Sequence, residues 1–166
     1  MASSPYIQDY YPDDLAWCYG CGRYNAHGHH FQTMWDGDET VTRFTPEPFH
    51  IAIPGFVYGG LLASLIDCHS TGSAALAAYR AAGHEPGDDA PVPRFVTAAL
   101  QVNYLKPTPL GVPLEARGRI KEVRPRKVVV ETTVYANGEA CVRGEAVLVK
   151  MPENMVPGNL PAPSPP

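Results

Sequence analysis

Apolar and polar positions alternate along much of this chain, and one segment follows a different period. Between residues 59 and 79, apolar residues such as Leu61, Leu65 and Ala75 recur at spacings of three and four, which predicts one long helix ended by Gly83 and Pro86. Residues 31–46 predict a hairpin around the turn "DGDE". Residues 94–107, 112–123 and 127–150 predict four more strands, the last two joined at "ANGE".

This order of elements, with two strands, one helix and then four strands in meander, restricts the fold. A single helix cannot supply the repeated crossovers of a doubly wound sheet. We therefore predict an α+β fold, in which an antiparallel sheet of about six strands wraps around one long central helix. The predicted domain covers residues 18–151, between an N-terminal arm at 1–17 and a disordered tail at 152–166 that holds six prolines.

Composition narrows the function classes. The 166 residues carry a formal net charge of −4 and no long Lys/Arg cluster, which argues against a nucleic-acid partner. The short run "RPRK" at 124–127 predicts a hairpin turn, with a phosphate contact as the alternative. No apolar run approaches the ~20 residues of a membrane span, and the N-terminus is not typical of a signal peptide. Four cysteines are not typical of a disulfide framework, so we expect a cytoplasmic location.

The stretch "PGFVYGGLLASLIDCHSTGSA" at 54–74 carries the candidate chemistry. Gly59 and Gly60 begin the predicted helix, where free backbone N–H groups can polarise a carbonyl and stabilise an oxyanion. Asp67 lies further along among apolar residues, where burying a carboxylate costs free energy unless the group has partners or a function. It could attack a thioester carbon, or it could act as general base on a water molecule. The structural alternative is an acid that pairs with His69 or a strand hydroxyl.

The same stretch resembles the hotdog-fold acyl-CoA thioesterases of the phenylacetate-pathway type. That family typically carries His-Gly-Gly with an acid nine residues after the His, and here Tyr58, Gly59, Gly60 and Asp67 stand in those places. The segments "CYGCGRYNAHG" and "NYLKPTPLG" are also similar to family motifs, so the resemblance spans roughly residues 18–150. It implies a hotdog fold and hydrolysis of an acyl-CoA to a carboxylic acid and free CoA, without a cofactor. It also implies a dimer or dimer of dimers with active sites at the subunit boundary.

The resemblance also implies roles for further residues. Thr97, seven residues before Tyr104, stands where relatives often orient the attacking water with Ser or Thr. Tyr58 replaces the usual His, and His50 is the candidate to take over its role. Surface cations are expected to hold the CoA phosphates, and the acyl pocket is expected to be apolar. These substrate-binding candidates are Tyr58, Gly59, His50, Phe56, Leu61, Leu62, residues 31–35, Lys106, Arg124, Arg126 and Lys127.

Other interpretations stay open at this stage. A hotdog hydratase or dehydratase would need a His five residues after Asp67, where the chain has Gly72. A non-catalytic acyl-thioester binding module is favoured modestly by Tyr58 and by Ala52, which stands where relatives often carry Asn. Cys18, Cys21, His27 and His29 could form a zinc site, but their second pair is too close in sequence for common finger spacing. We therefore predict no metal, a substrate-covering loop at these residues, and Cys68 in the core.

Overall fold

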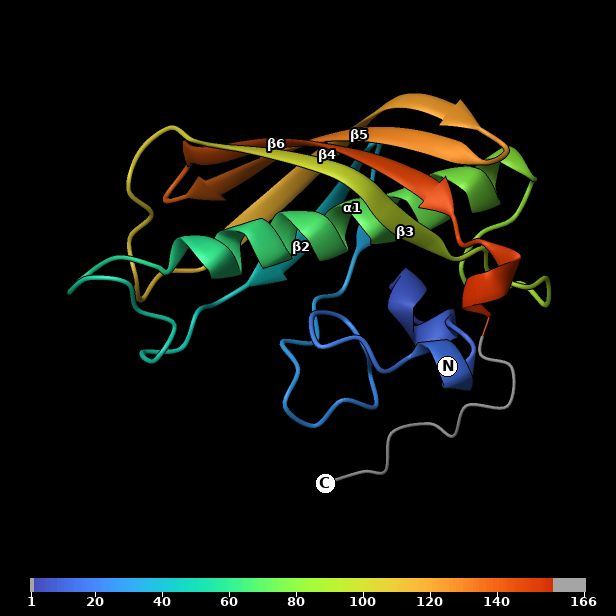
Figure 1. Ribbon diagram of the computed structural model, residues 1–166, viewed down its shortest axis with the longest axis horizontal. Coiled ribbons are helices and arrows are strands. Elements are labelled where there is room, and N and C mark those ends of the chain that lie inside the picture. The colour runs from blue at the N-terminus through green and yellow to red at the C-terminus, as the bar shows by residue number, and fades with distance from the viewer. Residues whose placement is uncertain (1, 157–166) are drawn as a thin grey trace.

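The segment with helical periodicity forms the long helix α1 (Gly59–Ala81) in the computed structural model, which describes residues 2–156 (Figure 1). The sheet contains six strands, which the predicted hairpins and alternating stretches supply. They are β1 (Met34–Asp36), β2 (Glu39–Phe44), β3 (Phe95–Tyr104), β4 (Leu114–Arg124), β5 (Lys127–Ala136) and β6 (Glu139–Lys150). Short 3-10 turns flank this core at η1 (Ile7–Tyr10), η2 (Asp13–Leu15) and η3 (Glu153–Met155).

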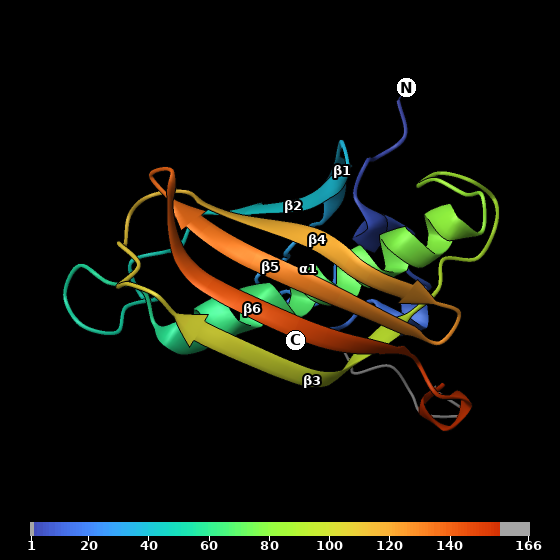
Figure 2. The same ribbon diagram turned by 90° about the horizontal axis from the view of Figure 1, so that it is seen from above.

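All six strands pair antiparallel in the order β1-β2-β4-β5-β6-β3, which Figure 2 shows from above. The predicted meander of four strands is therefore wrong for β3, which pairs with β6 at the far edge. The reason is that β2 already occupies the free edge of β4, so β6 is the remaining place for β3. Helix α1 connects β2 to β3 across the concave face of the sheet.

The turns between strands follow the local sequence. Asn137 and Gly138 take positive φ angles of 52° and 77° between β5 and β6, as a tight two-residue hairpin requires. Arg124 and Lys127 form the closing pair of the β4–β5 hairpin, so the run "RPRK" is a turn as predicted.

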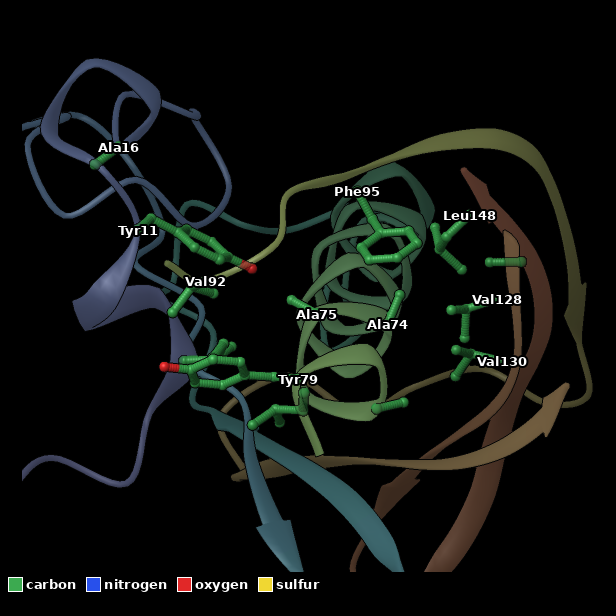
Figure 3. Packing of buried hydrophobic residues seen from close by; sticks show 14 residues of the cluster. Tyr11, Ala16, Ala74, Ala75, Tyr79, Val92, Phe95, Val128, Val130 and Leu148 are labelled. Carbon is green, nitrogen blue, oxygen red and sulfur yellow. The ribbon is translucent and has the colours of Figure 1, made fainter. Parts of the chain in front are cut away.

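The helix is buried on most sides because the curved sheet covers one side and the N-terminal segment covers the other (Figure 1). Small residues such as Ala74 and Ala75 are fully buried, and Figure 3 shows Ala74 on the side of Leu148 and Val128 and Ala75 on the side of Tyr11 and Val92. Small side chains let a sheet approach a helix closely, and burial of apolar area stabilises this contact by about 25 cal/mol per Å².

The residues predicted to form an N-terminal arm pack against this core. Ile7 and Tyr11 are 0% and 2% exposed, and both belong to the same buried cluster as Ala75. At the other end, η3 lies within the predicted tail, and residues 157–166 of that tail lie outside the described residues. Within residues 2–156, no helix is long and apolar enough to cross a membrane.

Candidate active site

Asp67 lies in the third turn of α1, half-buried, and it faces strand β3. The Thr97 hydroxyl donates a hydrogen bond of 2.5 Å to Oδ1 of Asp67. The structure thus brings together two residues that the sequence placed thirty positions apart. The partner of the acid is a strand hydroxyl, and His69 instead bonds to other residues.

A β-bulge makes this contact compatible with the rest of β3. Thr97 reaches α1 through its hydroxyl, and so does Tyr104, whose hydroxyl donates to the Gly59 carbonyl at 2.7 Å. Side chains alternate between the faces of a strand, so residues seven apart would normally point to opposite faces. At the register shift between Thr97 and Ala99, β3 carries one extra residue relative to β6, and this extra residue turns Thr97 to the same face as Tyr104. The bulge therefore directs both hydroxyls at the helix.

Two glycines begin α1, and the Tyr58 side chain lies against the second of them. Tyr58 occupies the N-cap position and provides no side-chain cap, so the first N–H groups of the helix have no capping partner there. The Tyr58 ring lies over Gly60, where an added Cβ would come within 2.4 Å of the ring atom Cε1. A side chain at position 60 would displace this ring, which is 58% exposed.

Gly60 and Asp67 are separated along the helix. Seven residues at 1.5 Å each place them about 10 Å apart on the axis. A single thioester carbonyl cannot contact the Gly60 N–H and the Asp67 carboxylate of the same chain at hydrogen-bond distance.

Several other predicted site residues gather near the N-terminal end of α1. The His50 carbonyl accepts the Tyr58 N–H at 2.9 Å, whereas its imidazole Nδ1 accepts the Glu47 N–H at 2.9 Å. The imidazole also packs 5.2 Å from the ring of His29, so its Nδ1 is engaged within its own loop. Phe56 forms a bridge with Pro109 in the loop after β3, and Leu61 is buried.

The basic candidates divide between the two ends of the molecule. Lys106 follows β3 near the start of α1 and pairs with Glu139 at 3.0 Å. Arg124, Arg126 and Lys127 belong to the β4–β5 hairpin, which lies at the opposite end of α1 (Figure 1). Arg124 lines a surface pocket together with Ala81 and Ala82, the last residues of the helix region. Within one chain, these three cations are not brought to Gly60 or Asp67.

Comparison with known proteins decides the family. A family model described as "Thioesterase superfamily" matches residues 54–142, the segment from the loop before α1 into β6. The chain belongs to this superfamily. Its fold is the hotdog fold, with one long helix packed against a six-stranded antiparallel sheet.

The chain is also similar to curated acyl-coenzyme A thioesterases. Acyl-coenzyme A thioesterase THEM4 of Xenopus laevis is 29% identical over 106 residues, which are 64% of this chain and 41% of THEM4. THEM4 of Mus musculus is 30% identical over 94 residues, which are 57% of this chain and 34% of that protein. The chain thus matches less than half the length of these relatives.

Solved structures agree with this assignment. A thioesterase superfamily protein from Shewanella loihica PV-4 is 54% identical, with a TM-score of 0.62 over 76% of this chain and 96% of that one. The E. coli PaaI protein from the phenylacetic acid degradation operon matches with a TM-score of 0.59 over 75% of this chain and 81% of that one. At 14% identity, PaaI shares the fold.

The structure contains a cluster of three cysteine thiols that the sequence did not predict. Cys68, the residue after Asp67, places its thiol beside those of Cys18 and Cys21, and the three sulfur atoms lie within 4.8 Å of one another. The reading of Cys68 as an ordinary core residue is therefore incomplete. His27 is exposed and His29 stacks on Phe31 at 5.1 Å, so neither joins the thiols. The C-x2-C spacing was visible in the sequence, but its third member depends on tertiary structure.

Proposed function

We propose that this protein hydrolyses an acyl-CoA thioester to a carboxylic acid and free CoA. The observation that carries the proposal is the Asp67 carboxylate, held by the Thr97 hydroxyl on the central helix of a thioesterase-superfamily fold. Relatives named acyl-coenzyme A thioesterase support the same reaction class.

In the proposed reaction, the Gly60 N–H at the start of α1 polarises the thioester carbonyl and stabilises the oxyanion that develops on it. Asp67 attacks the carbonyl carbon to give a mixed anhydride with loss of the CoA thiolate, and water then cleaves the anhydride. Alternatively, Asp67 takes a proton from a water molecule that attacks the same carbon. Thr97 acts as a positioning residue in both routes, since its bond to Oδ1 leaves Oδ2 for the substrate or water.

We further propose that each active site is built from two chains. The separation of about 10 Å between Gly60 and Asp67 along the axis requires that the two groups on one carbonyl come from different copies. Such an assembly would also give Arg124, Arg126 and Lys127 a role, since they could contact the CoA phosphates only in a site that another copy completes. Lys106 is a candidate for the same phosphates from the near end of α1.

We propose that the protein acts in the cytoplasm. The four cysteines all lie among the described residues and form no disulfide, which fits a reducing compartment.

A second candidate function is a non-catalytic acyl-thioester binding module. The observation that favours it is the Tyr58 ring, which lies over Gly60 and supplies no imidazole. A hydratase is disfavoured, because an added Cβ at Gly72 would lie 2.6 Å from the Gln8 amide nitrogen. No space is left at that position for the histidine that such an enzyme would need.

The test is release of free CoA from a panel of short, long and aromatic acyl-CoAs by the full chain. Chromatographic measurement of CoA is preferred, because a thiol reagent would also react with the protein cysteines. Asp67→Asn keeps an acceptor for Thr97 and is expected to lower kcat roughly 10²- to 10⁴-fold with retained substrate binding. Asp38→Asn, in the exposed β1–β2 turn, is the matched control and should keep full activity.

The outcomes separate the two candidates. No CoA release by the wild type across the panel, together with measurable acyl-CoA binding, would establish the binding module instead. Equal turnover by wild type and Asp67→Asn would remove Asp67 from the mechanism.

A further inference from the structure

Three thiols from two distant segments meet beneath the central helix. Cys18 and Cys21 come from the loop after η2, and Cys68 comes from α1. The sulfur atoms of Cys18 and Cys68 are 3.9 Å apart, and all three lie within 4.8 Å. Cys21 and Cys68 are 3% and 6% exposed, whereas Cys18 is half-buried and leaves access from solvent.

These distances match a shared metal better than a disulfide. A tetrahedral zinc ion with Zn–S bonds of about 2.3 Å places its sulfur ligands about 3.8 Å apart. A disulfide would instead join only two of the three sulfur atoms, at about 2.05 Å, and would leave the third thiol unbonded.

The backbone of the loop is shaped around the sulfur atoms. An added Cβ at Gly20 would lie 2.2 Å from the Cys68 sulfur, so this thiol packs directly against the loop backbone. The Gly22 N–H donates to the Cys18 carbonyl at 2.7 Å, which closes the turn and brings the two loop cysteines to the same side. Neither glycine could be replaced without moving the loop or a thiol.

A positive charge lies close enough to act on the trio, since the Cys18 thiol and burial raise the pKa of Cys21 and the Arg94 guanidinium opposes these larger effects by lowering it. Burial alone would lower the pKa of Arg94, but neighbouring groups that can ionise to anions, the three thiols among them, raise it above its usual range. Among residues 2–156, no carboxylate forms an ion pair with Arg94. Its positive charge would balance the single net negative charge of three thiolates around a divalent cation.

Tyr11 packs against Arg94 and carries an unpaired polar group. Its ring lies under the Arg94 guanidinium at 4.1 Å, and its hydroxyl points toward α1 (Figure 3). This hydroxyl is buried and has no hydrogen-bond partner among the described residues. Such an orphaned group normally has a water or ion as its partner.

We propose that Cys18, Cys21 and Cys68 bind a thiophilic divalent cation, Zn²⁺, with a water molecule as the fourth ligand. Binding displaces the thiol protons and ties the N-terminal loop to α1 at the residue next to Asp67. The metal would thereby fix the loop that covers the side of the helix opposite the sheet.

The test uses Co²⁺ as a spectroscopic probe, added to the full chain with reduced thiols and without oxygen. Wild type is expected to bind about one Co²⁺ per chain, with near-ultraviolet sulfur-to-cobalt absorption and the visible bands of tetrahedral coordination, and Zn²⁺ should displace it. Cys68→Ala should lose these bands. Cys141→Ala is the matched control, since Cys141 is buried in β6 apart from the trio, and it should retain them.

If Cys68→Ala fails to fold, the Co²⁺ titration of the wild type still tests the proposal. Absence of these bands in both wild type and Cys141→Ala would overturn the proposal. A mass lower by two hydrogen atoms in protein purified without reductant, combined with no Co²⁺ binding after reduction, would show a redox pair in place of a metal site. None of these readouts depends on thioester hydrolysis, so this proposal can fail independently of the proposed enzyme activity.

Discussion

His69 is a fully buried, polar residue in the middle of α1, two positions after Asp67. Its ring nitrogens bond to the hydroxyls of Thr42 at 2.8 Å and Thr40 at 3.2 Å, and Ser73 bonds to Thr40 at 2.6 Å. Burial lowers the pKa of His69 from 6.5 to about 3. The imidazole is therefore neutral in the folded protein, and its hydrogen bonds connect α1 to strand β2.

This lowered pKa predicts a pH-dependent stability. Between pH 6.5 and about 3 the unfolded chain binds a proton at His69 and the folded chain does not, so the free energy of unfolding falls as pH falls. One such group contributes up to about 1.4 kcal/mol per pH unit. We expect urea denaturation from pH 7.5 to 4.5 to show this loss in wild type and a shallower one in His69→Gln. The difference between the two curves isolates His69 from the carboxylates, and parallel curves would contradict the assignment.

At the scale of elements, the contact between β3 and α1 sets the position of the candidate carboxylate. Thr97→Val keeps the shape of the side chain but removes the donor to Asp67. If the carboxylate must be held in a reactive position, kcat should fall about 10- to 100-fold with little change in KM. Thr97→Ser should retain most activity, because it keeps the hydroxyl.

The control for this pair is Thr133→Val on β5, which tests the general effect of replacing a half-buried strand threonine. Steady-state kinetics on the best acyl-CoA of the panel distinguish the variants. An equal loss of activity in Thr97→Val and Thr97→Ser would indicate a packing role for this residue.

The elements themselves were largely predictable, because their signals are local. Helical spacing after Gly59 and the turn at Asn137 and Gly138 each depend on a few neighbouring residues. The place of β3 was not predictable, because it depends on which strand edge is left free after β2 pairs with β4. The bulge at Thr97 has no local sequence signal, and Thr97 itself was found through family resemblance. The meeting of Cys68 with Cys18 likewise depends on packing across fifty positions.

At the scale of the whole molecule, the two edges of the sheet differ in length. The edge strand β1 has 3 residues and the edge strand β3 has 10, so β3 presents a long row of backbone groups for pairing. Leu100 and Tyr104 on this strand are 37% and 55% exposed, and the loop before α1 exposes Phe49 and Ile53 at 76% and 64%. A second copy of the chain could cover this apolar edge, which supports the two-chain active site proposed above.

Mixing two inactive variants tests the shared site directly. Gly60→Pro removes the proposed oxyanion donor in the first turn of α1 and displaces the exposed Tyr58 ring, and Asp67→Asn removes the carboxylate. If each site takes Gly60 from one chain and Asp67 from the other, half of the randomly assorted dimers carry one intact site of two. Co-refolding of equal amounts should then restore about a quarter of wild-type activity.

A mixture of Asp67→Asn with Asp67→Ala is the matched control, because every site it forms lacks the carboxylate and stays inactive. Light scattering on the same samples shows whether dimers are present. If dimers form and the mixed variants recover no more activity than the sum of the two alone, then Gly60 and Asp67 do not act on one carbonyl from two chains. If the active wild type is a monomer, the 10 Å separation along α1 (about seven residues at 1.5 Å) excludes Gly60 as the donor for a carbonyl attacked by Asp67.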